Sequence, residues 1–156
     1  MSAAVAGQSI LDQLRSQGQL TEDQYDRALA KARTSGTRAE EAILATDGMS
    51  ESMLMKWLAA HYKTQFVSTD KLSRANVERP LLRKVPRQLA QRAMACPILW
   101  KAASGTLAVV VAEPSDVLEE QLRLAAAAKT VKLLVARPAA IEAAIQKHYD
   151  GDARAF

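Results

Sequence analysis

The stretch that decides the fold is GTLAVVVAEPSD, residues 105–116. Its first part, Thr106 to Ala112, is a continuous apolar run rich in valine, which favours a buried strand. The run from Ile98 to Ala102 has a similar character and is joined to it through a short turn, so the two predict a β-hairpin. The PSD tripeptide that closes the stretch predicts the start of a helix ending near residue 128.

The sequence on both sides of this stretch supplies the remaining elements of a small α/β unit. Upstream, Gln65–Val67 predicts a short strand, and Arg87–Ala95 predicts a helix because a proline precedes it. Downstream, Val131–Val135 predicts a second buried strand, and Ala139–Tyr149 predicts a closing helix that starts after Pro138. These elements predict a small mixed sheet with flanking helices.

The first third of the chain has helical periodicity instead. Apolar residues recur at three- and four-residue steps, and glycine or serine-threonine clusters separate four such segments. Thr21 and Gln24 have the form of a capping box at the start of the second segment, and Ser50 is placed to cap the fourth. The apolar residues of the four segments are Ile10, Leu11 and Leu14; Tyr25 and Leu29; Ile43 and Leu44; and Leu54, Trp57 and Leu58.

The two patterns together predict an α+β protein. We expect a four-helix, tandem-hairpin subdomain at residues 1–63 and an α/β subdomain at residues 64–150. Residues 151–156 are expected to form a tail or the start of a linker.

Basic residues are concentrated in the middle of the chain. The net charge is +4, but residues 63–101 alone carry nine basic and two acidic side chains. An acidic partner or an anionic ligand would be attracted to this region. The alternative interpretation is a solvated basic helix face.

No pattern in the sequence predicts catalysis. The chain lacks a phosphate-binding G-x-x-x-x-G-K-[ST] loop, and neither His61 nor His148 has a metal ligand at suitable spacing. The single cysteine, Cys96, lies between apolar residues and is expected to be a buried structural thiol. We therefore predict no enzyme activity, no catalytic residue and no metal. The N-terminus has no signal-peptide pattern, which favours a cytoplasmic location.

Three passages resemble the N-terminal domain of the assembly ATPases of type II secretion and type IV pilus systems, the GspE/PilB family with its MshEN type. The first is LRKVPRQLA at residues 82–90 followed by CPI at residues 96–98, the second is the stretch 105–116, and the third is the closing IEAAIQKHY at residues 141–149. They occur in the order and spacing of the family, and the resemblance extends from about residue 8 to residue 149. The resemblance implies the same α+β fold.

The helical part is also similar to the MshEN plan of two 24-residue motifs, here beginning at Ser9 and Arg38. In the family these motifs bind cyclic di-GMP, and the resemblance implies Arg38, Gly18 and His61 as weak candidates for that ligand. Most other ligand positions are changed: the leading arginine of the first motif is Ser9, and a glycine of the second motif is replaced by Glu40. A carboxylate beside a dianionic ligand would repel it.

The resemblance implies a non-catalytic docking or regulatory module. Its expected partner is the cytoplasmic part of an inner-membrane assembly-platform component or another motility or secretion protein, so the module is expected to be recruited to that membrane. A cyclic di-GMP-type nucleotide sensor is the alternative, and a basic nucleic-acid-binding module is a third interpretation, which would require strong salt dependence. The candidate partner-binding residues are Arg79, Arg83, Lys84, Arg87 and Trp100.

Overall fold

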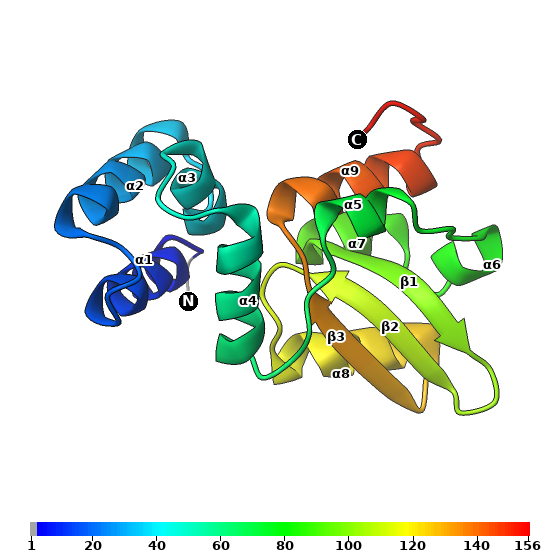
Figure 1. Ribbon diagram of the computed structural model, residues 1–156. Helices are drawn as coiled ribbons and strands as arrows, with labels where there is room; N and C mark the ends of the chain where they lie inside the picture. Colours follow the sequence, from blue (N-terminus) through cyan, green and yellow to red (C-terminus); the bar gives the residue numbers. More distant parts are fainter. Residues whose placement is uncertain (1–2) are drawn as a thin grey trace. The chain divides into compact units, whose positions relative to one another are not determined.

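The computed structural model describes the backbone of residues 3–156 and the side chains of residues 10–156 (Figure 1). The chain folds as two compact units, one ending at Leu54 and the other formed by Met55–Phe156. The predicted α+β class is confirmed, with helices first and then a three-stranded mixed sheet with flanking helices. None of the helices in the described part of the chain is long and apolar enough to cross a lipid bilayer.

The first unit contains the predicted helices in the predicted order. They are α1 (Ala3–Ser16), α2 (Glu22–Ser35), α3 (Ala39–Ala45) and the beginning of α4 (Glu51–His61), which continues into the second unit. The predicted capping box is confirmed. Thr21 Oγ1 accepts a hydrogen bond from the backbone N–H of Gln24, and the Gln24 side chain accepts one from the backbone N–H of Thr21.

The second unit is built on the sheet that the sequence predicted. Strand β1 (Ala95–Lys101) pairs antiparallel with β2 (Thr106–Val111), and β2 pairs parallel with β3 (Thr130–Val135). All of β2 except its first residue is buried, because it is the central strand and is covered on both faces. The predicted strand at Gln65–Val67 is reduced to a single bridge between Phe66 and Val135.

Helices cover the two faces of this sheet (Figure 1). One face carries α8 (Asp116–Ala126), which buries Leu118, Leu122 and Ala126 at four-residue steps. The other face carries α9 (Pro138–Tyr149), α7 (Arg87–Ala93) and α5 (Thr69–Ser73). The predicted helix from residue 87 therefore ends at Ala93 rather than residue 95.

A short helix, α6 (Arg79–Leu82), lies beside β1 (Figure 1). The segment between α6 and α7 is fixed to the end of α9 by Tyr149. The Tyr149 hydroxyl donates a hydrogen bond to the carbonyl oxygen of Val85, 2.6 Å away, and burial raises the pKa of this phenol well above its usual range. This contact holds Lys84, which follows α6, in a defined place against the sheet.

Candidate functional site

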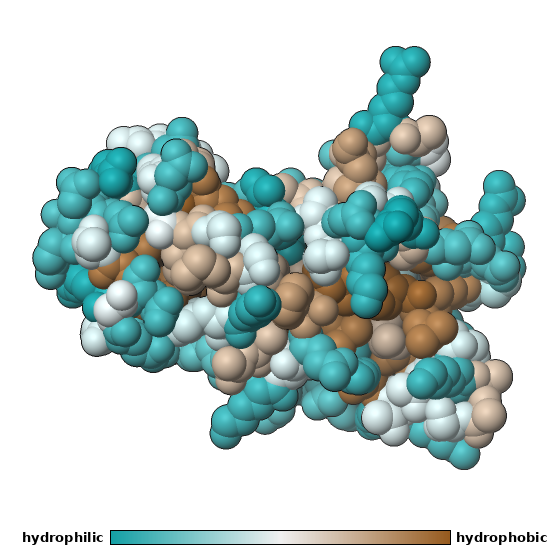
Figure 2. All heavy atoms as spheres, viewed as in Figure 1, coloured by the Kyte–Doolittle hydropathy of each residue, from teal (hydrophilic) through white to brown (hydrophobic). Residues whose placement is uncertain are grey.

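A groove beside β1 collects several of the residues that the sequence singled out. It has a volume of about 360 Å³. Figure 2 shows apolar surface over the strands of the second unit, bordered by hydrophilic residues. The groove is lined by Asn76, Glu78, Pro80, Leu81, Lys84, Ile98, Leu99 and Trp100. We call it the β1 groove.

The apolar wall of the β1 groove depends on an irregularity in β1. The register with β2 shifts between Pro97 and Leu99, so Ile98 is the extra residue of a β-bulge. A regular strand turns consecutive side chains to opposite faces of the sheet, whereas here residues 98–100 all line the groove. Leu99 is 48% exposed, which makes it one of the exposed large apolar residues of the described chain.

Trp100 and Lys84 form a cation–π pair at this groove. The Lys84 ammonium lies 3.7 Å from the centroid of the Trp100 ring, and both residues are half-buried. The contact places a positive charge directly on apolar surface. An acidic or amphipathic segment would find both an ion-pair partner and an aromatic surface there.

The three other predicted partner-binding residues are all exposed arginines, but one of them already binds a carboxylate of the chain. Arg79 in α6 and Arg83 just after it are both exposed. Arg87 is exposed too, but its Nε donates a 2.7 Å hydrogen bond to Oδ1 of Asp150, which lowers the pKa of that carboxyl group. The charge of Arg87 is therefore already matched within the fold.

Leu81, Ile98 and Leu99 are groove residues that sequence reasoning did not select. The sequence assigned Ile98 and Leu99 to a strand, where apolar residues are expected to be core. A bulge has no simple sequence signature, so the position of Ile98 and Leu99 in one groove could not be predicted.

The candidate nucleotide-binding residues belong to two different units of the structure. Gly18 lies in the turn after α1 with φ of 75°, and Arg38 is the residue before α3, so both belong to the first unit. His61 ends α4 in the second unit and stacks on Trp57 at a centroid distance of 4.9 Å. Ser9, the first residue of the predicted motif, lies outside the residues whose side chains are described.

Arg38 is held by the residue that replaces a motif glycine. Its Nη2 lies 3.1 Å from Oε2 of Glu40, and its Nε also donates to that oxygen. The Glu40 side chain is only 1% exposed, and its other oxygen, Oε1, is buried without a hydrogen-bond partner among the described residues. Glu40 thus supplies the anion that a bound phosphate would otherwise provide to this guanidinium group.

Neither metal nor thiol chemistry is apparent in the described part of the chain. No three histidine, cysteine or carboxylate side chains come together there as a metal ion would require. Cys96 is buried as predicted, and burial raises the pKa of its thiol to about 12. A thiol with this pKa stays protonated near neutral pH and is a poor nucleophile.

Comparison with known proteins identifies the family. The model of the MshEN domain family matches residues 67–155, a range that lies within the second unit. No curated protein sequence matches the chain significantly. The predicted 24-residue motifs lie in the helical part outside the matched range, so their assignment stays a prediction.

Solved structures share the fold across both units. A structure of MshE with cdg, which is cyclic di-GMP, is 23% identical, with a TM-score of 0.64; the match covers 89% of this chain and 97% of that one. A structure of the N-terminal domain of XpsE is 19% identical, with a TM-score of 0.59, over 94% of this chain and 96% of that one. A second crystal form of the XpsE domain is 21% identical, with a TM-score of 0.51 and 88% and 93% coverage. The predicted resemblance is confirmed, and the chain belongs to the MshEN domain family.

Proposed function

We propose that this chain is a non-catalytic docking module of a bacterial secretion or type IV pilus machine, with the β1 groove as its docking surface. The partner is an acidic, amphipathic segment in the cytoplasmic part of an inner-membrane assembly-platform component. Binding to that component would bring the module to the membrane.

The proposal rests mainly on one observation: the exposed Leu99 lies in an apolar groove that the Lys84–Trp100 cation–π pair also lines. Tryptophan and arginine are enriched among the residues that dominate binding energy at protein interfaces, usually around an apolar centre. Arg79 and Arg83 add exposed positive charge close by in the sequence. A surface of this composition matches an acidic segment with apolar anchors.

Site-specific photocrosslinking in the source bacterium tests the proposal. A photoreactive amino acid is placed at Leu99 and, as a matched control, at Val117, an apolar residue on α8 that is 71% exposed. We expect position 99 to crosslink to a platform component of the machine and position 117 not to do so. Lys84→Glu should remove the crosslink, whereas Lys129→Glu, an exposed lysine outside the groove, should leave it.

Equal crosslinking from both positions would contradict the proposal. A crosslink from position 99 to DNA or RNA would contradict it as well. Nucleic-acid binding would then be established separately by an affinity that falls steeply as the salt concentration rises.

A second candidate function is binding of cyclic di-GMP, as in the MshE structure with cdg. It is favoured by Arg38, which stands at the first position of the predicted second motif. Because the Arg38 guanidinium group is already ion-paired with Glu40, we expect calorimetry to detect no binding of cyclic di-GMP to the wild-type chain. Binding that Arg38→Ala abolishes would overturn this expectation and favour the sensor.

A further inference from the structure

The edge of β3 that faces away from β2 is hydrogen-bonded to the rest of the chain along only part of its length. On one side β3 pairs with β2 along its whole length, and on the other its one β-bridge to a described residue joins Val135 and Phe66. There, the N–H of Val135 donates to the carbonyl oxygen of Gln65 at 2.9 Å, and the N–H of Val67 donates to the carbonyl oxygen of Val135 at 2.8 Å. The N–H of the next residue, Ala136, points the other way and donates to the carbonyl oxygen of Val111 on β2. Backbone groups of consecutive residues therefore face opposite sides of β3, and those of Val135 face outward.

This alternation places the N–H and C=O groups of Val131 and Leu133 on the same outer side as those of Val135. The carbonyl oxygen of Leu133 accepts a 2.6 Å hydrogen bond from the Thr64 hydroxyl. The strand-like pairing stops at Thr64 because Lys63 has a positive φ of 55°, which turns the chain away. Among the described residues, no backbone hydrogen bond reaches the outer side of Val131 or the N–H of Leu133. Such an edge is a template for another strand.

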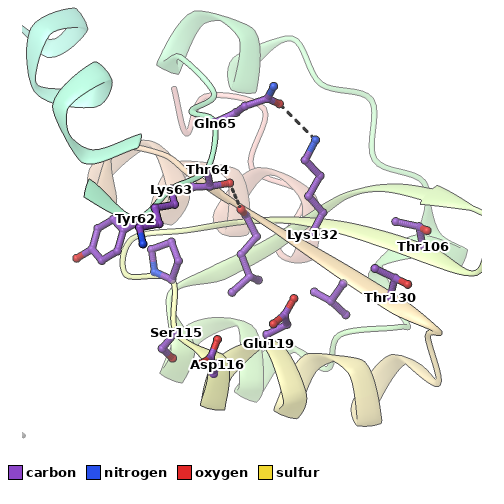
Figure 3. Close-up of a pocket in the computed structure, with 13 residues that line it drawn as sticks. Tyr62, Lys63, Thr64, Gln65, Thr106, Ser115, Asp116, Glu119, Thr130 and Lys132 are labelled. Carbon is purple, nitrogen blue, oxygen red and sulfur yellow. Dashed lines mark hydrogen bonds between the residues drawn. The ribbon is translucent and has the colours of Figure 1, made fainter. Parts of the chain in front are cut away.

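A groove runs along this unpaired half of β3 (Figure 3). Its volume is about 690 Å³, and its base includes Thr130–Leu133. One wall is the segment Tyr62–Gln65, and the other is the first turn of α8 with the residue before it. A neighbouring strand in a sheet lies about 4.8 Å away, so a single extended chain between these walls would be in hydrogen-bonding position. We call this recess the β3 groove.

The charges in the β3 groove are separated between its two sides. Lys132 points to the side of Gln65 and donates to its side-chain oxygen at 3.3 Å (Figure 3). On the α8 wall, Asp116 and Glu119 form no ion pair with any described residue, unlike Glu120 on the same helix, which binds Arg123. Lys63 lies on the Tyr62–Gln65 wall and Lys132 points toward that wall, so the groove holds two lysines and two carboxylates, and its α8 wall is the acidic side.

We propose that the β3 groove binds an extended peptide segment by strand addition. The backbone of the segment pairs with Val131 and Leu133, and a lysine or arginine side chain on its α8-facing side meets Asp116 and Glu119. The β1 groove lies at the opposite edge strand of the sheet and is expected to attract acidic segments. The two grooves therefore differ in the charge of their ligand, and either can fail in experiment without the other.

The test uses nuclear magnetic resonance on the full chain with two synthetic peptides. In one, valine alternates with lysine, and in the other, valine alternates with glutamate. At saturating lysine peptide, we expect the amide hydrogens of Val131 and Leu133 to exchange at least about tenfold more slowly, because they become bonded in the new ladder. The amide of Val67, which is already bonded, should keep its exchange rate.

Charge variants provide the control for the acidic wall. Asp116→Asn and Glu119→Gln should each weaken binding of the lysine peptide by up to about fivefold, the range of a solvent-accessible ion pair. Glu120→Gln, which changes a carboxylate outside the groove, should leave the affinity unchanged. Unchanged exchange at Val131 and Leu133, equal binding of the glutamate peptide, or an affinity insensitive to both groove variants would each overturn the proposal.

Discussion

Replacing Arg38 by alanine is expected to lower the free energy of unfolding of the first unit by about 3 kcal/mol. The reason is that Glu40 is almost fully buried and would lose the guanidinium group that compensates its charge. An unpaired buried carboxylate must either be desolvated at high cost or take up a proton. Hydrogen exchange of the amides of α3 and of its C-cap, such as the Thr46 N–H that donates to the carbonyl oxygen of Ala42, measures this loss within the unit.

Arg27 provides a matched control. It also forms an ion pair within the first unit, with Asp23, but both side chains are more than half exposed. Arg27→Ala should therefore cost no more than about 0.5 kcal/mol. The double variant Arg38→Ala with Glu40→Gln should recover part of the loss, because it removes the buried charge. Equal losses from Arg38→Ala and Arg27→Ala would show that the Arg38–Glu40 pair has no special role.

Leu122→Ala is expected to destabilise the second unit by about 3 kcal/mol. Leu122 is fully buried in the core between α8 and the sheet, and shortening it leaves a cavity as well as removing buried apolar surface. Urea unfolding followed by the fluorescence of Trp57 and Trp100, both in this unit, measures the change.

The matched control lies two residues away on the same helix. Leu124 is 65% exposed, so Leu124→Ala should change the stability by no more than about 0.5 kcal/mol. The pair tests which side of α8 faces the sheet. Similar losses from the two variants would mean that the helix is oriented differently.

The main elements of the fold could be predicted because their hydrophobic patterns are long. The run at residues 105–116 gave a central strand and a helix start within one residue of the observed bounds, and the capping box at Thr21 marked the start of α2. Helices α5 and α6 could not be predicted, since five and four residues are too few to establish a helical period. Strand β1 begins at Ala95 rather than residue 98, because Met94 takes a left-handed conformation that ends α7 early.

The candidate sites depended more on tertiary structure than on pattern. The sequence indicated a basic region, but it could not show that Asp150 would neutralise Arg87 from 63 positions away. The bulge at Ile98, which brings residues 98–100 to one groove, could not be predicted from the sequence either. Glu40 was expected to repel an anionic ligand; that it would be buried against Arg38 follows only from the packed structure.

The most direct test of the docking account is a calorimetric affinity measurement with the platform component captured at Leu99. Leu99→Glu puts an acidic group into the β1 groove, and Val117→Glu makes the same change at an exposed apolar position of α8. The account predicts that Leu99→Glu weakens binding about thirtyfold, the effect of losing an interface anchor worth about 2 kcal/mol, while Val117→Glu binds as the wild type does. Wild-type affinity of Leu99→Glu would contradict it.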